Sequence, residues 1–209
     1  MTKKELTRKE RERLQRRNEI LSIALKLFSE QGFRNVSMQQ IAEASEFSVG
    51  TLYNFFESKE TLFEELINTT GQQVLSEFLE ILNEPGSEKD ILWAFIMHQP
   101  KFLAKHGNIL KLYFTEIAAK NLQLSKIHDV NNIHKIIDSR LSEIIEQGIQ
   151  KGIFRAVDPE IAAKSLGATI ETSVFETTEN VNNDEVINKF KKVEQLFLEG
   201  LLLPKDSHA

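Results

Sequence analysis

Residues 37–56 read SMQQIAEASEFSVGTLYNFF, and this stretch decides how the rest of the chain is interpreted. Ser37, followed three residues later by Gln40, forms a capping box that opens a short helix, and Ser48 marks a second helix start soon afterwards. Two short helices joined by a tight turn have the spacing of a helix-turn-helix, whose second helix lies in the major groove of DNA. Any helical bundle also contains adjacent short helices, so the spacing alone leaves a purely structural role open.

The side chains of the second helix favour contact with DNA. Leu52 and Phe56 lie four residues apart and are expected to face the core. The opposite side then presents small or neutral groups that can approach base edges, namely Val49, Gly50, Thr51, Tyr53 and Asn54. Gly50 lets the backbone come close to DNA, and Thr51 offers a hydroxyl group and a methyl group that suits a thymine methyl.

Helix signals also dominate the rest of the chain. Nine glycines and four prolines among 209 residues argue against a sandwich or barrel of many short strands. Apolar residues at three- and four-residue intervals predict an all-α fold of about nine or ten helices. We expect Gly32 to end the first helix in the left-handed conformation, Pro100 to kink or end a later helix, and Gly107 to separate it from the next. We place a basic arm and a three-helix DNA-binding domain in residues 1–57, and a larger helical domain in residues 58–209.

Charge is distributed unevenly along the chain. The net charge of −5 by itself disfavours nucleic acid as a partner. Residues 1–17, however, hold eight lysines and arginines and three glutamates, a local charge of +5, whereas the remaining residues carry −10. This asymmetry predicts a basic arm whose arginines reach phosphates or a minor groove. A solvated helix start with internal salt bridges explains the same residues equally well.

Three motifs between Ile20 and Leu62 carry a family resemblance. They read Ile20-Leu21-x-x-Ala24-Leu25-x-Leu27-Phe28-x-x-x-Gly32-Phe33, then Ser37-x-x-x-Ile41-Ala42, then Ser48-x-Gly50-Thr51-Leu52-Tyr53-x-x-Phe56-x-x-Lys59-Glu60-x-Leu62. Together they strongly resemble the N-terminal domain of tetracycline-repressor-like (TetR family) transcriptional regulators. The rest of the chain is compatible with the helical C-terminal domain of that family but carries no comparable motif.

The resemblance implies roles for individual residues in DNA binding. It implies a capping hydroxyl that also donates to a phosphate, two glutamines at the DNA-facing helix start, three base-reading positions and two phosphate clamps: Ser37, then Gln39 and Gln40, then Val49, Gly50 and Thr51, then Tyr53 and Lys59. Ser48 and Asn54, at the two ends of the same segment, complete the predicted DNA-binding residues. Lys59 lies in the first turn of a helix, where a positive charge is poorly matched to the helix dipole, so an external anion would explain it.

The sequence departs from the family pattern in and after the turn. Ser45-Glu46-Phe47 replaces the usual Ala-Gly-Val, and Glu46 lacks the ease with which glycine adopts a positive φ. The geometry of the turn is therefore an open question. Phe55 stands where the family often has Tyr or His, so one polar phosphate contact is expected to be missing, and the basic arm would compensate for it.

The C-terminal domain contains two apolar stripes that are candidates for a dimer interface. One stripe comprises Ala163, Leu166, Gly167, Ile170 and Val174, and the other comprises Val186, Phe190, Val193, Phe197 and Leu201. Intramolecular core explains both stripes equally well. The resemblance implies a homodimer, and a two-fold operator also calls for two recognition helices about 34–36 Å apart.

The family's C-terminal domain also binds a small inducer. Aromatic-lined clefts between helices are the usual ligand sites, so the candidate pocket residues are Trp93, Phe95, Ile96, Phe102, Tyr113, Phe114 and Phe175. Three polar residues beside the apolar stripes, His98, Glu116 and Glu171, are candidates for a polar contact. Ordinary core packing explains the apolar residues as well, and an internal salt bridge or exposure explains the polar ones.

No sequence pattern indicates an enzyme, a metal site or a cofactor. The chain has no cysteine, which fits a reducing cytoplasm, and its five histidines form no ligand pattern. No apolar segment reaches the roughly 18 residues of a membrane span. We therefore expect a cytoplasmic homodimer that binds a palindromic double-stranded DNA operator, most simply as a repressor, and is released by a small, largely apolar effector. The alternative is a helical carrier of lipids or other small molecules without sequence-specific DNA binding.

Overall fold

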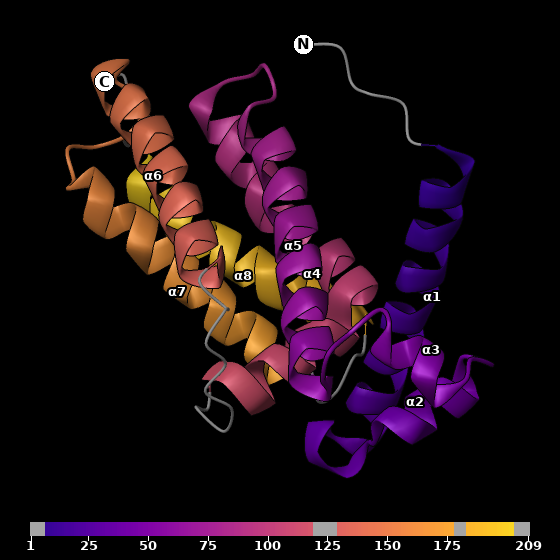
Figure 1. The fold of residues 1–209 in the computed structure, drawn as a ribbon. Helices are drawn as coiled ribbons and strands as arrows, with labels where there is room; N and C mark the ends of the chain where they lie inside the picture. The colour runs from indigo at the N-terminus through magenta and orange to yellow at the C-terminus, as the bar shows by residue number, and fades with distance from the viewer. Residues whose placement is uncertain (1–6, 119–128, 178–182, 203–209) are drawn as a thin grey trace, which may run out of the picture. The chain divides into compact units, whose positions relative to one another are not determined.

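The computed structural model of the protein describes residues 7–118, 129–177 and 183–202. These residues form eight α-helices, one 3₁₀ turn and one π-helical turn, with bounds α1 (Arg8–Gln31), η1 (Phe33–Asn35), α2 (Met38–Ala44), α3 (Val49–Tyr53), α4 (Lys59–Leu82), α5 (Glu88–Leu112), η2 (Tyr113–Ala118), α6 (Asp129–Gln150), α7 (Pro159–Thr177) and α8 (Asn183–Leu201) (Figure 1). Apart from one isolated β-bridge between Phe154 and Leu202, the described residues contain no extended pairing. The expected all-α fold is confirmed.

One long helix replaces two expected shorter ones in the middle of the chain. α5 runs on past Gly107, so the predicted separation at Gly107 is wrong, and of the two alternatives expected at Pro100 the helix does not end there. Proline removes one backbone donor and is unfavourable inside a helix. The residues before and after Pro100, such as Ile96 and Leu103, are nevertheless buried in the core. Their burial holds the helix together across the proline.

Gly32 ends α1 in a conformation that differs from the expected left-handed one. Its φ of 81° is positive, as expected for a glycine, but its ψ of 149° is extended. The backbone N–H of Gly32 donates to Phe28 O at 2.8 Å, which closes the last turn of the helix. The chain therefore leaves α1 directly into the η1 turn.

The described residues divide into two compact units. The first comprises residues 7–69 and 112–118, and the second comprises residues 70–111, 129–177 and 183–202. α4 contributes to both units, because the division falls between Thr69 and Thr70, within the helix. The first unit thus contains α1, η1, α2 and α3, the beginning of α4, and η2.

An aromatic cluster lies at the centre of the first unit. Phe28 of α1, Phe33 of η1 and Phe63 of α4 are all buried, and their ring centroids lie 4.8 to 5.6 Å apart. Tilted and edge-on ring pairs at this separation add to the hydrophobic stabilisation of burial. The cluster joins three segments, and in the same unit α2 packs against both α1 and α3 (Figure 1).

A second aromatic cluster joins helices of the second unit. Phe78 of α4 packs edge-on against Phe95 of α5, with ring centroids 5.2 Å apart, and in a tilted arrangement against Phe102, with centroids 4.8 Å apart. α7 packs against α6 on one side and contacts α8 on another. None of the described helices combines the length and the apolar character that crossing a bilayer requires.

Candidate nucleic-acid interface

The first helix of the expected helix-turn-helix begins with a complete capping box. Ser37 Oγ accepts from Gln40 N at 3.2 Å, and Gln40 Oε1 accepts from Ser37 N at 2.8 Å, as the sequence predicts. Gln39 is exposed and its amide donates to Glu43 Oε1 at 3.2 Å. The structure therefore brings Ser37, Gln39 and Gln40 together on the exposed start of α2, where the capping hydroxyl is already engaged with the helix.

The turn between α2 and α3 forms although it lacks the usual glycine. Glu46 has a φ of 59° and is the only non-glycine residue with a positive φ among the described residues. The chain reverses through hydrogen bonds from Glu46 N to Glu43 O at 3.2 Å and from Phe47 N to Ala42 O at 2.9 Å. A side chain in this conformation costs roughly 1–2 kcal/mol. The turn therefore forms with Glu46 in a strained backbone conformation.

α3 presents the expected side chains to solvent. Ser48 caps the helix, because its Oγ accepts from Thr51 N at 3.0 Å and lies 2.7 Å from Thr51 Oγ1. Leu52 is buried on the opposite face. The residues on the outer side are exposed or half-buried, with 51% of Tyr53 accessible; they are Ser48, Val49, Gly50, Thr51, Tyr53 and Asn54.

Lys59 has internal partners at the start of α4. Its Nζ donates to Phe33 O at 2.8 Å and to Val36 O at 2.9 Å, and it lies 4.3 Å from the centre of the Phe33 ring. These carbonyl groups account for a cation in the first turn without an external anion. Its assignment as a phosphate clamp stays a prediction, which would use the remaining N–H of the ammonium group.

The described part of the basic arm is helical. Thr7 and Glu10 form a capping box, α1 begins at Arg8, and residues 7–16 are exposed. Residues 1–6, with Lys3 and Lys4, lie outside the described residues. Arg13 lies 5.8 Å from the centre of the Phe55 ring, which places this part of α1 beside the segment that follows α3.

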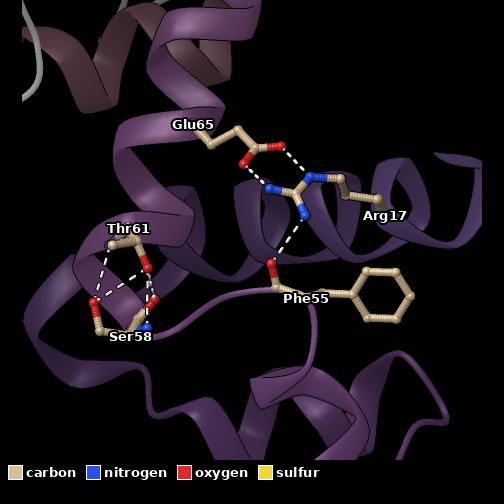
Figure 2. A network of polar contacts seen from close by, with 5 residues as sticks. All are labelled: Arg17, Phe55, Ser58, Thr61 and Glu65. Carbon is tan, nitrogen blue, oxygen red and sulfur yellow. Dashed lines mark hydrogen bonds and ion pairs between the residues drawn. The ribbon is translucent and has the colours of Figure 1, made fainter. Parts of the chain in front are cut away.

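Arg17, the last basic residue of the arm, forms a polar network that the sequence analysis did not predict. Its guanidinium Nη1 donates to Phe55 O at 2.9 Å, while Nε and Nη2 pair with both carboxylate oxygens of Glu65 on α4 (Figure 2). The guanidinium carbon also lies 4.5 Å from the centre of the Phe56 ring. The partners are far apart in sequence, so no local spacing marks them.

The predicted effector residues do not form one cluster within one unit. Tyr113, Phe114 and Glu116 belong to η2 in the first unit, whereas the other seven belong to the second. Phe95, Ile96 and Phe102 are buried in the core, but Trp93 and Phe175 are 50% and 48% exposed and Glu171 is exposed. A groove of about 440 Å³ lies elsewhere in the second unit, between α5 and α8, and is lined by Met97, Pro100, Lys101, Leu103, Ala104, Asn183, Val186 and Ile187.

Most of the predicted dimer stripe is buried inside the single chain. Ala163, Leu166, Ile170, Val174, Val186, Phe190, Val193 and Leu201 are buried, and Gly167 and Phe197 are half-buried. Their burial follows from the packing of α7 with α6 and α8. Intramolecular core, the alternative explanation of these stripes, accounts for the buried residues, and a second copy would need other faces of the two helices.

Glu77 of α4 accepts hydrogen bonds from three basic residues of α5. His98 Nε2 lies 2.7 Å from Glu77 Oε1, and Lys105 Nζ and His106 Nε2 lie 2.7 and 3.3 Å from Oε2. Burial would raise the pKa of Glu77, but the hydrogen bonds from these residues outweigh it and lower the pKa to about 2. Burial lowers the pKa of His106, although Glu77 opposes this. The described residues hold no cluster of three or more side chains suited to a metal ion.

Comparison with known proteins supports the helix-turn-helix. A family model described as "Bacterial regulatory proteins, tetR family" matches residues 20–66. The transcriptional repressor KstR2 of Rhodococcus jostii is 25% identical over 194 residues, 90% of this chain and 92% of that protein.

Two solved structures resemble the fold along most of its length. One is the transcriptional regulator FadR of Bacillus subtilis in complex with stearoyl-CoA, which is 24% identical with a TM-score of 0.69 and covers 88% of this chain and 98% of its own. The other is AibR in complex with isovaleryl coenzyme A and operator DNA, which is 22% identical with a TM-score of 0.69 and the same coverage. At these identities the two structures show a shared fold.

Replacing Glu46 by glycine should stabilise the protein. Glycine removes the strain of the positive φ, which costs roughly 1–2 kcal/mol, and loses part of this gain to the greater entropy of its unfolded chain. We expect Glu46→Gly to raise the free energy of unfolding in urea by about 0.5–1 kcal/mol. Glu46→Ala removes the same carboxylate but keeps the strained backbone, so it should give no such gain. Equal stabilisation by both variants would contradict the backbone explanation.

Replacing Glu77 by glutamine should remove a pH-dependent part of the stability. The pKa of Glu77 is depressed from 4.5 to about 2, so its carboxylate stabilises the folded state above pH 4.5 and loses this effect as the pH falls towards 2. We expect Glu77→Gln to lower the free energy of unfolding by about 2 kcal/mol at pH 7, and the difference from the wild type to shrink between pH 4.5 and 2. Urea titrations at several pH values measure this. Glu80→Gln, an exposed change on the same helix, is the control and should show no pH-dependent difference.

Proposed function

The chain belongs to the TetR family of bacterial regulatory proteins, and we propose that it represses transcription by binding double-stranded DNA through α3. The observation that carries this proposal is the exposed outer side of α3, where Val49, Gly50 and Tyr53 project while Leu52 is buried behind them. Small and neutral groups on a helix that enters the major groove can contact base edges and the thymine methyl. The cytoplasm, where such a regulator would meet DNA, is the proposed location.

A homodimer is part of the proposal, because a two-fold operator requires two copies of α3. An exposed face of α7 suits this contact. Five exposed residues recur there at alternating spacings of four and three: Ile161, Ser165, Ala168, Thr172 and Phe175. This 3.5-residue period is that of a seam between paired helices, and the small residues at its centre permit close approach. On α8, Leu196 is 67% exposed and adds apolar surface.

The proposed effector is a small, largely apolar molecule. Similar proteins have been solved with stearoyl-CoA and with isovaleryl coenzyme A, both of which carry an apolar acyl chain. Residues 58–209 would form the effector and dimer domain, and residues 1–57 the DNA-binding domain. For release of DNA, the effector must bind the DNA-free conformation more tightly than the DNA-bound one. The proposal includes no catalytic step and no cofactor.

The alternative function, a carrier that binds small molecules without reading DNA, is separated from regulation by a DNA-binding experiment. The full chain is used to select sites from random double-stranded DNA, and the affinity for the selected site is then measured at several salt concentrations. We expect a palindrome with half-site centres about 34–36 Å apart. A steep salt dependence without sequence preference would leave only nonspecific binding and contradict the proposal.

Two substitutions on α3 test the assigned roles within this experiment. Thr51→Ala should weaken binding to the selected site about tenfold, equivalent to about 1.4 kcal/mol, with little change on random DNA. Tyr53→Phe removes a phosphate contact and should weaken binding to both DNAs. Thr69→Ala, an exposed threonine on α4, is the matched control and should leave both affinities unchanged. Wild-type affinity of both α3 variants would refute the assignments.

A charge on the exposed seam tests the homodimer. Leu196→Glu and Ala168→Glu should dissociate the dimer, because each would bury an unpaired carboxylate in the interface. Molar mass from light scattering should fall from twice the chain mass to 24.0 kDa at micromolar concentration. Trp93→Glu changes another half-exposed apolar residue, on α5, and should leave the dimer intact. A wild-type chain that is already monomeric would overturn the dimer proposal.

A further inference from the structure

The recognition helix is too short to hold its own conformation. α3 comprises only five residues, Val49–Tyr53, whereas isolated helices shorter than roughly 12–15 residues are marginal in water. Its N-terminal end is capped by Ser48, whose Oγ accepts from Thr51 N. Its last turn runs into residues 54–57, which lead to α4 without forming a helix. The orientation of α3 therefore depends on whatever fixes this connecting segment.

Arg17 fixes the connecting segment at its middle. The guanidinium donates to Phe55 O at 2.9 Å (Figure 2). Its carbon also lies 4.5 Å from the centre of the Phe56 ring, so one side chain holds two successive residues after α3. Phe56 is itself buried. Arg17 thus joins α1 to the end of the recognition segment through a charged hydrogen bond and a cation–π contact, which the planar guanidinium makes at the same time as its pairing with Glu65.

Glu65 fixes the guanidinium in turn. Its carboxylate pairs with Nε and Nη2 of Arg17 in the bidentate arrangement that matches a planar fork, and the two side chains are only 28% and 30% exposed. Glu65 lies in the second turn of α4, and this helix is anchored at its start by Ser58 and Thr61. Ser58 N donates to Thr61 Oγ1 at 2.9 Å, and Thr61 N donates to Ser58 Oγ at 3.1 Å (Figure 2).

We infer that Arg17 is a positioning residue of the DNA-reading helix and not one of the phosphate contacts of the basic arm. All three of its N–H-bearing nitrogens are committed within the protein, and its charge is matched by Glu65. The guanidinium sets where the recognition segment ends relative to α1 and α4. Arg17 therefore contributes to discrimination between DNA sequences, whereas a phosphate contact contributes equally to all sequences. This inference rests on the proposed DNA-binding function.

The substitution Glu65→Gln separates a positioning residue from a phosphate contact, because the two roles predict opposite changes in affinity for the selected site. Removing a negative charge near DNA favours binding to any sequence, and it would also free Arg17 to reach a phosphate. If Arg17 is a positioning residue, the same change loosens the recognition segment. We therefore expect Glu65→Gln to weaken binding to the selected site about tenfold while binding to random DNA stays equal or becomes tighter. Glu57→Gln, an exposed change in the connecting segment with the same loss of charge, is the matched control.

The substitution Arg17→Lys gives a second readout that keeps the positive charge. A lysine ammonium cannot pair bidentately with Glu65, donate to Phe55 O and stack on Phe56 at once. The slope of log affinity against log salt should stay that of the wild type, since no phosphate contact is lost, while the preference for the selected site falls about tenfold. Arg16→Gln, on the exposed neighbouring residue, should change binding to both DNAs by the same factor. Thermal unfolding of each variant establishes that the comparison is made between folded proteins.

The outcomes distinguish this inference from the proposed function. A wild-type chain that shows no sequence preference overturns the proposed function itself, and the inference with it. If the wild type selects a site, tighter binding of Glu65→Gln to both DNAs, or a salt slope of Arg17→Lys that falls by about one, makes Arg17 a phosphate contact and overturns the inference alone. Loss of preference in both variants, with the wild-type salt slope retained, supports it. Should Arg17→Lys fail to fold, Glu65→Gln decides the question by the sign of its effect.

Discussion

The burial of Leu52 and Phe56 is the constraint on which the DNA-reading surface depends. α3 has five residues and gains little from its own hydrogen bonds, so its free energy must come from packing. Leu52 and Phe56 are almost wholly inaccessible to solvent. Fully burying such side chains contributes roughly 1.5–3 kcal/mol each. The outer face of α3 is therefore exposed because its inner face is buried in the core. The apolar contacts hold α3 in place, and the polar contacts of Arg17 set its orientation.

Signals that act within a few residues of one another were predictable. The capping box at Ser37 and the cap at Ser48 form as expected, because a capping side chain reaches only the next turn of its own helix. The conformation of the turn at Glu46 could be predicted only in part. The sequence showed that a residue other than glycine stands there, but only the surrounding hydrogen bonds decide whether the backbone keeps a positive φ or finds another path.

Interactions between residues far apart in the sequence were beyond prediction. Arg17 looked like one of eight basic residues of an arm, and nothing near it in the sequence indicates Glu65 as its partner. Lys59 likewise lacks a local partner in the sequence, whereas in the structure its Nζ donates to the carbonyls of Phe33 and Val36, which lie far from it along the chain. The uninterrupted α5 has the same cause. The burial of residues around Pro100 outweighs the local preference of proline, and burial depends on residues distant in sequence, such as Phe78 of α4 against Phe95 and Phe102.

Amphipathic stripes show which residues are buried but not what buries them. The apolar stripes of α7 and α8 were equally compatible with a core and with a dimer interface, and in the structure they serve the core of the second unit. The face that remains for a second copy is less apolar, because it mixes Ile161 and Phe175 with small residues such as Ala168. The amino-acid composition of an interface between folded chains is closer to that of the protein surface than to that of the core. A search for the most apolar stripe therefore finds the core first, and the contact between two chains that we propose uses instead the exposed face with its period of small residues.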